Sequence, residues 1–382
     1  MVYTSTWGFI SDFFSLFATA SRYFIPSHAV PNISIETLSS LLDIIASSML
    51  AVTTFSLSIM VAAFASTSSS GTPRAYKLMM NDDNTRLAIT SFISAFIYAV
   101  IAKIALGLQY YGVSGRFVLF VSTILVLIYL IVTLIRWVQR LSQLGTLTNA
   151  ISKIETAASQ ALSTFRAHPN FGASGQKPLG ESQLKIHPKQ TGYFTHFVIE
   201  SLNLLAQTHN AHIHLAFLPG KFVYPSLVLI EVFAENLIDD EELKNLEQQI
   251  HEYVIIETNR SFLQDPRFGL LVMSEVGQKA MSAAINDVGS AISAINALTR
   301  IIIDSQPDPE QKTFNFSNIS VDMFDIREFI NSSFAPMARD CLSNIELNQR
   351  IIKCLSMIEK MYLNRNYGKL LMKWHMKSWH AA

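Results

Sequence analysis

Three long apolar stretches constrain what this chain can fold into more than any other feature. They cover Leu41–Ala65, Leu87–Leu108 and Phe117–Ile135. Each approaches or exceeds the roughly 20 residues that a helix needs to cross the hydrocarbon core of a bilayer. Because lipid offers no hydrogen-bond partner to the backbone, such stretches cross it as helices. We therefore expect an α-helical integral membrane domain with three spans over residues 36–137.

The first stretch is unusual because small and hydroxylated side chains share one face of its helix. At 100° per residue, this narrow face holds Asp43, Ser47, Ala51, Thr54, Ser58 and Ala62. Bulky residues such as Met49 and Phe55 lie mostly opposite. Inside a membrane, such a face favours contact with something other than lipid. Two interpretations are open: the face packs in a close helix seam, or it lines a path for water and ions with Asp43 at the mouth.

Basic and aromatic residues near the ends of the stretches predict their orientation and depth. The basic residues are Arg74, Lys77, Arg86, Arg136 and Arg140. By the positive-inside rule, the link between the first two stretches and everything after the third should be cytoplasmic. Tyr98 and Trp137 are expected at the membrane interfaces, where aromatic rings are enriched. Residues 1–35 are rich in aromatic side chains and predict an interfacial helix or a fourth, degenerate span.

The composition narrows the functional classes. Of the 382 residues, 50% are hydrophobic and 15% are charged, and the formal net charge is zero. The chain therefore lacks the basic footprint of a nucleic-acid-binding protein. Cys341 and Cys354 have no metal-type spacing. The sequence contains no Gly-rich phosphate loop, no Gly-x-Ser-x-Gly elbow and no zinc-protease motif. We expect a protein that is not an enzyme and needs no cofactor.

After the spans, the pattern predicts a cytoplasmic α+β domain. Apolar residues at three- to four-residue spacing continue through 138–168, which predicts a helical stalk. The Gly-, Pro- and Ser-rich segment 169–189 predicts a linker. Alternating apolar segments and turns in 190–258 predict a small β-rich unit. Residues 259–382 predict a helical unit that is divided by a polar loop over Asp304–Ser320.

A combination of motifs begins at Arg260, which lies five residues before an Asp-Pro pair. A Phe-Gly pair follows, and an Ile-Asn-Asp run comes after one predicted helix. The motif residues are Arg260, Gln264, Asp265, Phe268, Gly269, Asn286 and Asp287. The pattern resembles the signature of an uncharacterised family of predicted bacterial membrane proteins, domain of unknown function 2254. The resemblance extends from about Ser40 to Thr299 and implies a multi-span protein of the bacterial inner (plasma) membrane, without implying an activity.

Two interpretations of these motif residues are open. Asp265 precedes Pro266 and is suited to cap the helix that starts there, and Asp287 is suited to cap the next helix. Arg260 can pair with one of these carboxylates in a forked geometry. In the first interpretation the residues are structural, as caps and a buried ion pair. In the second, Asp265, Asn286 and Asp287 belong to a ligand-binding or catalytic site.

Three histidines are weak candidates for metal ligands. If Ile213 lies on a strand, His212 and His214 share one face of it. That spacing suits zinc, with His209 or His196 as a third ligand. No carboxylate or Cys lies at a matching offset. A solvated strand fits the same residues, and we predict no metal site.

Three helices alone cannot enclose a polar path and also shield it from lipid. We therefore expect a homo-oligomer in the lipid bilayer, assembled through the polar face of the first span. One functional hypothesis is a channel or pore-like transporter for an ion or small solute, with the cytoplasmic domain as its regulator. The alternative is a membrane-anchored scaffold or signalling protein in which that face only holds helices together.

Overall fold

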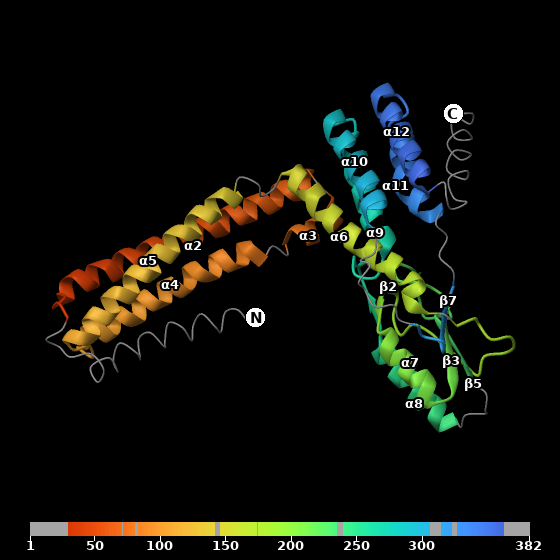
Figure 1. The fold of residues 1–382 in the computed structure, drawn as a ribbon, viewed down its shortest axis with the longest axis horizontal. Helices are drawn as coiled ribbons and strands as arrows, with labels where there is room; N and C mark the ends of the chain where they lie inside the picture. The colour runs from red at the N-terminus through yellow and green to blue at the C-terminus, as the bar shows by residue number, and fades with distance from the viewer. Residues whose placement is uncertain are drawn as a thin grey trace. The chain divides into compact units, whose positions relative to one another are not determined.

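The structure is a computed structural model that describes residues 30–70, 72–80, 83–141, 146–173, 175–234, 240–305, 315–322 and 327–362. The chain divides into two compact units, Met1–Asn149 and Ala150–Ala382, and each is described by itself (Figure 1). The N-terminal helix predicted within residues 1–35 lies outside the described residues, apart from the last few positions of that range.

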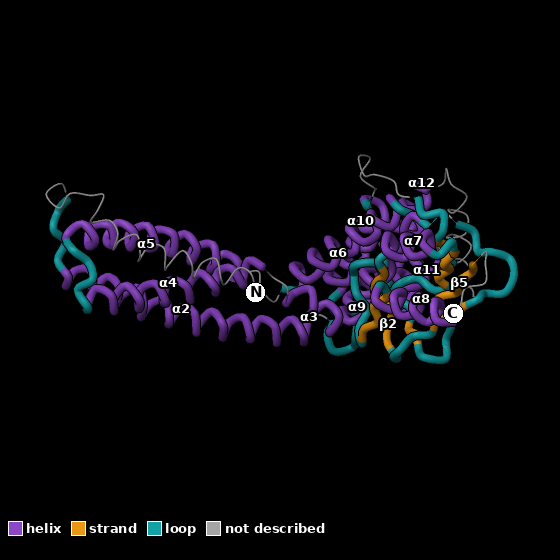
Figure 2. Tube along the Cα trace, turned by 90° about the horizontal axis from the view of Figure 1, so that it is seen from below, coloured by secondary structure: helices purple, strands orange, loops and turns teal. Residues whose placement is uncertain are grey.

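The first unit is a bundle of long helices that run side by side (Figure 2). Its elements are α2 (Ile35–Ser70), α3 (Pro73–Met80), α4 (Asp83–Gly107) and α5 (Val113–Leu141). The segments Ile35–Ala63, Arg86–Gly107 and Val113–Leu141 are long and apolar enough to cross a membrane. The prediction of three spans is therefore confirmed, and α2 and α5 extend beyond the predicted limits at both ends.

Four bulky side chains in the first half of α2 form its inner face, whereas Phe55, expected opposite the polar face, is exposed. The core of the bundle includes Leu38, Leu42, Ile45 and Met49 of α2, Phe92 of α4, and Leu119 and Leu130 of α5. Most of the α2 packing is against α4, with α5 contacting both helices. Because lipid is as apolar as these side chains, close van der Waals packing is what stabilises such a bundle.

Polar side chains link the three helices inside the bundle. The Tyr98 hydroxyl lies 2.9 Å from Ser122 Oγ and 3.1 Å from Thr123 Oγ1, and Trp137 Nε1 donates to Ser56 Oγ at 2.8 Å. Tyr98 and Trp137 are both buried. Partners on neighbouring helices satisfy the polar atoms of both side chains, so their rings pack inside the bundle. Their depth relative to the membrane interfaces stays a prediction.

The predicted stalk is also corrected. Residues 142–145 lie outside the described part of the chain, and α6 (Leu147–Ala167) follows. From Ala150 onward, α6 buries an apolar face within the second unit. Glu155 of α6 accepts hydrogen bonds from Arg300 of α10 (Val288–Asp304) at 2.6 and 2.7 Å. The amphipathic pattern of 138–168 thus reflects packing against other helices and not an isolated stalk.

The second unit contains two small sheets, drawn in orange in Figure 2. Their strands are β1 (Leu184–Ile186), β2 (Gly192–Phe197), β3 (Ala211–Leu215), β4 (Phe222–Val223), β5 (Ile230–Ala234), β6 (Val254–Glu257) and β7 (Ile319–Val321). The larger sheet has the order β1-β5-β3-β7, with only β3 and β7 parallel. The smaller sheet, β4-β2-β6, is antiparallel. Helices α7 (Ile199–Thr208) and α8 (Asp240–Glu252) pack against these strands.

Two segments predicted to be loops contribute strands to the larger sheet. Within the predicted linker 169–189, Leu184–Ile186 pairs with β5 as β1, and the Gly175 N–H donates to the Ile319 carbonyl at 3.0 Å. At the end of the polar segment Asp304–Ser320, Ile319 begins β7 beside β3. Ile186 and Ile319 are buried in the sheet core. Burial of these single apolar residues outweighs the loop-like composition around them.

The remainder of the described second unit is helical. Besides α10, its helices are α9 (Pro266–Ala280), α11 (Arg327–Asp340) and α12 (Ile345–Tyr362). α9 packs between α10 and α11, and α12 packs on α10. The predicted fold class, three membrane helices followed by an α+β domain with a small β-rich unit and then helices, is confirmed.

Candidate functional site

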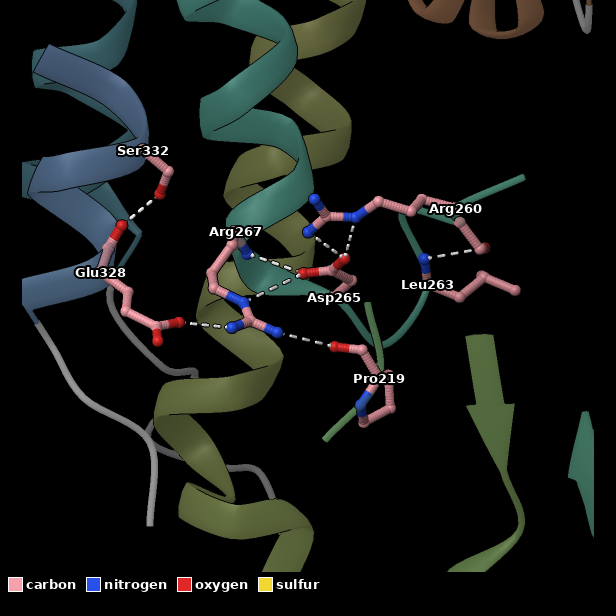
Figure 3. A network of polar contacts seen from close by, with 8 residues as sticks. Pro219, Arg260, Leu263, Asp265, Arg267, Glu328 and Ser332 are labelled. Atoms are coloured by element: carbon pink, nitrogen blue, oxygen red, sulfur yellow. Dashed lines mark hydrogen bonds and ion pairs between the residues drawn. The ribbon is translucent and has the colours of Figure 1, made fainter. Parts of the chain in front are cut away.

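A buried carboxylate organises the start of α9. Asp265 is 1% exposed, and its Oδ2 accepts hydrogen bonds from Arg260 Nε at 2.8 Å and Arg260 Nη2 at 2.5 Å (Figure 3). Its Oδ1 accepts the Arg267 backbone N–H at 3.2 Å. Asp265 is therefore both the N-cap of α9 and the ion-pair partner of Arg260, which donates from two nitrogens to one carboxylate oxygen.

Arg267 extends this network to two other elements. Its guanidinium donates to Glu328 of α11 at 2.5 Å and to the Pro219 carbonyl at 3.1 Å (Figure 3). Burial raises the pKa of the Asp265 carboxyl, while the Arg260 and Arg267 guanidiniums act in the opposite direction. The two arginines are what make a charged carboxylate tolerable at this buried position.

A cavity of about 480 Å³ lies beside the network. Its lining comes from β2, from β4 and the turn before it, from the loop before α9 and the first turns of α9, and from α11. The lining residues are Tyr193, Gly220, Lys221, Phe222, Arg260, Arg267, Leu271, Glu328, Asn331 and Ser332. This volume lies within the range of small-molecule sites in proteins.

The cavity combines an aromatic wall with cationic groups. Tyr193 and Phe222 are paired across β2 and β4, and their rings meet edge to face at 5.1 Å between centroids. Phe222 is 50% exposed. Lys221 Nζ lies 5.1 Å from the Phe217 ring centroid and has no hydrogen bond or ion pair with any described residue. An apolar wall with a few convergent polar groups is typical of ligand sites.

Gly220 is required by the network itself. Its φ is +96°, and a Cβ at this position would lie 2.1 Å from Asp265 Oδ2. Only glycine adopts such a φ readily, and only glycine leaves room for the carboxylate. The turn before β4 therefore closes directly over the buried ion pair.

The other motif residues of this segment have structural contacts. The Gln264 side chain accepts the Phe197 backbone N–H and donates to the Phe197 carbonyl, both at 3.0 Å, and so closes the end of β2. The Phe268 ring lies under the Arg260 guanidinium, at 5.0 Å from Cζ to centroid. A Cβ on Gly269 would lie 2.3 Å from Ala158 Cβ, so this glycine allows the close approach of α6 and α9.

Asn286 and Asp287 do not join this site. Asn286 has a positive φ of 46°, and Asp287 caps α10 by accepting the Ser290 N–H at 3.0 Å. Hydrogen bonds from Ser290 lower the pKa of the exposed Asp287 carboxyl. Of the two candidate carboxylates, Asp265 is therefore the one that pairs with Arg260. Asp287 caps a different helix, α10.

The polar face of α2 stays exposed in the single chain. We call Asp43, Ser47, Ala51, Thr54, Ser58 and Ala62 the α2 polar face, and all six are exposed. Its hydroxyls donate to carbonyls of their own helix, as Ser47 does to Asp43 at 2.7 Å and Ser58 to Thr54 at 3.0 Å. The Asp43 carboxylate forms an ion pair with Lys103 of α4.

The histidine candidates for metal binding are only partly brought together. His212 Nε2 and His214 Nδ1 each lie 2.8 Å from Ser320 Oγ of β7, so they share one face of β3. His209 instead contacts Glu242 at 2.8 Å, and His196 lies on β2 in the other sheet. Within the described residues, no group of three or more His, Cys, Asp or Glu could hold a metal ion.

The pair His212 and His214 predicts a pH-dependent stability. Burial lowers the pKa of both, with the His214 charge adding to the effect on His212 and Lys177 to that on His214. The unfolded chain then binds more protons than the folded chain below about pH 6.5. The free energy of unfolding should therefore fall as the pH drops through this value. The expected slope is up to about 1.4 kcal/mol per pH unit for each histidine.

Urea unfolding of the purified protein between neutral and mildly acidic pH measures this slope. His212→Gln keeps a hydrogen-bonding side chain without a titrating ring and should flatten the profile. Equal slopes for the variant and the wild type would contradict the assignment.

Several residues of the cavity were not identified from the sequence. Arg267 directly follows the Asp-Pro pair in the sequence. Its position in the first turn of the helix predicted there could have placed it beside Asp265. Glu328 lies 61 residues further along the chain and reaches the site only through the packing of α11 on α9. Phe222 begins a two-residue strand whose pairing with β2 has no local sequence signature, and Lys221 directly precedes it.

Comparison with known proteins confirms the resemblance noted from the motif residues. The profile of one family, DUF2254, described as predicted membrane protein, matches residues 5–357. No curated protein and no solved structure matches the chain. The matched range includes the three apolar helices and every residue that lines the cavity. The chain therefore belongs to the DUF2254 family of predicted membrane proteins.

Proposed function

We propose that this membrane protein forms a homo-oligomer in which the α2 polar face of each copy meets its neighbours and lines a path for an ion or small solute. The observation that carries the proposal is the direction of this face. α2 packs on α4 and α5 through Leu38, Leu42, Ile45 and Met49 and leaves the α2 polar face exposed, together with bulky residues such as Leu50 and Phe55. Lipid tails make no favourable contact with hydroxyl groups. A closely packed helix or water can form hydrogen bonds with them.

The spacing of the face supports association of helices. Ser47 and Ala51 lie four residues apart, as do Ser58 and Ala62, so small residues recur on each turn. This arrangement lets two backbones approach closely. Because the hydroxyls are already bonded to their own helix, the face can enter a contact without leaving buried donors unsatisfied.

A second candidate function is a membrane-anchored scaffold or signalling protein in which the face is only a seam. The ion pair between Asp43 and Lys103 favours it. Lys103 neutralises the carboxylate that would otherwise attract cations at a pore mouth. In this alternative, the second unit carries the function and the bundle serves as its anchor.

Conductance and assembly measurements separate the two candidates. The purified protein in planar bilayers should give discrete conductance steps, and Thr54→Leu should reduce them by filling the path. Native mass spectrometry in detergent should show an oligomer for the wild type. Leucine at Ser47 or Thr54 should weaken association about tenfold or more if the small face is the contact, equivalent to about 1.4 kcal/mol.

The matched control is Ile131→Leu, a conservative change at an exposed position of α5. It should leave both readouts unchanged. An oligomer that conducts nothing would reject the channel and favour the scaffold. A wild-type protein that is monomeric in detergent and in bilayers would contradict the proposal as a whole.

The proposal also assigns sides of the membrane. The second unit lies in the cytoplasm, below the inner membrane of a bacterial cell, and acts as the regulator of the oligomer. The support is the cluster Arg136 and Arg140 directly after the third apolar stretch, together with Arg74 and Arg86 between the first two. No catalytic step is part of this proposal.

A further inference from the structure

We propose that the cavity between the β2–β4 edge and helices α9 and α11 binds a small anion that carries a planar ring, of the size and kind of a nucleoside monophosphate. This inference concerns the second unit alone and does not depend on the α2 polar face. It rests on the cavity, its charge balance, unused donors and an exposed aromatic pair.

The charge balance around the cavity is positive. Lys221, Arg260 and Arg267 line it, against the carboxylates of Glu328 in the lining and Asp265 beneath. A guanidinium presents several N–H donors in a plane that suits a phosphate or carboxylate.

Donor atoms remain for a ligand after the internal network is formed. Arg260 uses Nε and Nη2 for Asp265, and its Nη1 has no hydrogen bond within the described residues. The Lys221 ammonium likewise has no carboxylate partner there. Asp265 fixes the Arg260 guanidinium from below, so the remaining donor is held in place before a ligand arrives. Such preorganisation lowers the cost of binding.

The aromatic pair Tyr193 and Phe222 indicates that the ligand carries a planar ring besides its anionic group. Phe222 is half exposed although its neighbour Val223 is fully buried, and its ring stands beside that of Tyr193 in the cavity wall. Exposed rings next to cationic groups form the stacking surface on which flat bases bind. Asn331 and Ser332 of α11 add hydrogen-bonding side chains to the lining.

A purely structural role of the ion-pair network explains fewer features of the cavity than a ligand site does. It explains Asp265, Arg260 and Gly220, which pack together at the start of α9. It does not explain why Lys221 and Phe222 line a cavity of about 480 Å³ beside that network. A site for a ring-bearing anion explains both groups of residues.

The test is equilibrium dialysis of the full-length protein in detergent with AMP, adenosine and inorganic phosphate as separate probes. AMP should bind, and adenosine and phosphate should each bind at least about tenfold more weakly, since each lacks one half of the recognised chemistry. No binding of AMP at millimolar concentration would overturn the proposal. Equal affinity for AMP and phosphate, or for AMP and adenosine, would overturn it as well.

Two variants keep the result tied to this cavity. Lys221→Ala should weaken AMP binding about tenfold or more, because one charge-assisted contact is lost. Phe222→Leu should weaken AMP binding by a similar factor and leave phosphate binding unchanged, because only the stacking surface is lost. Both side chains are exposed, so neither change disturbs the core.

Lys185→Ala, at an exposed position on β1, is the matched control and should bind AMP like the wild type. AMP binding that survives both cavity variants unchanged would place the ligand elsewhere and overturn the assignment. Since these measurements use binding alone, a protein without conductance still tests the inference fully.

Discussion

Asp265→Ala should lower the free energy of unfolding of the second unit by about 3–5 kcal/mol, the usual cost of removing one partner of a buried ion pair. The carboxylate accepts two hydrogen bonds from Arg260 and one from the Arg267 backbone. Without it, the Arg260 guanidinium loses its counter-charge, the Arg267 guanidinium keeps its ion pair with Glu328, and α9 loses its N-cap. Hydrogen–deuterium exchange of α9 peptides in the full-length protein measures the effect locally.

Asp287→Ala is the matched control for this prediction. Asp287 also caps a helix, α10, but it is exposed and has no guanidinium partner among the described residues. Its loss should cost only about 1 kcal/mol, as for an ordinary cap. If the two alanine variants prove equally stable, the burial and pairing of Asp265 do not contribute as argued.

The membrane helices could be predicted because their signal is local. Apolar length alone defines the three spans, and helical periodicity alone places Ser47, Thr54 and Ser58 on one face. The burial of Trp137 could not be foreseen in the same way. It depends on Ser56, which lies 81 residues earlier and reaches the Trp137 indole only after α2 and α5 have packed together.

The site was predictable only as far as one motif extends. Arg260 and Asp265 are five residues apart, so their pairing follows from the turn that joins them. The cavity is different because its walls come from separate parts of the chain. Tyr193 meets Phe222 through strand pairing, and Glu328 arrives on α11. Strand pairs as short as β4 and β7 carry too little pattern to be recognised before the sheets form.

Gly220→Ala is expected to destabilise the second unit by about 2–6 kcal/mol, from two causes of similar size. The φ of +96° is unfavourable for any residue with a Cβ, and the new methyl would lie 2.1 Å from Asp265 Oδ2. Two arginines hold that carboxylate, so it cannot move aside. Urea unfolding followed by exchange of α9 peptides reports the loss.

A second glycine separates the two causes. Gly180 also has a positive φ, +118°, but nothing lies within 4 Å of the position of its Cβ. Gly180→Ala should therefore cost only the backbone part, about 1–3 kcal/mol. In an Asp265→Ala background the clash at Gly220 disappears, and Gly220→Ala should then cost about as much as Gly180→Ala. A double-mutant cycle with no coupling between Gly220 and Asp265 would refute the close packing of the turn on the ion pair, and with it the fixed position of Arg260 at the cavity.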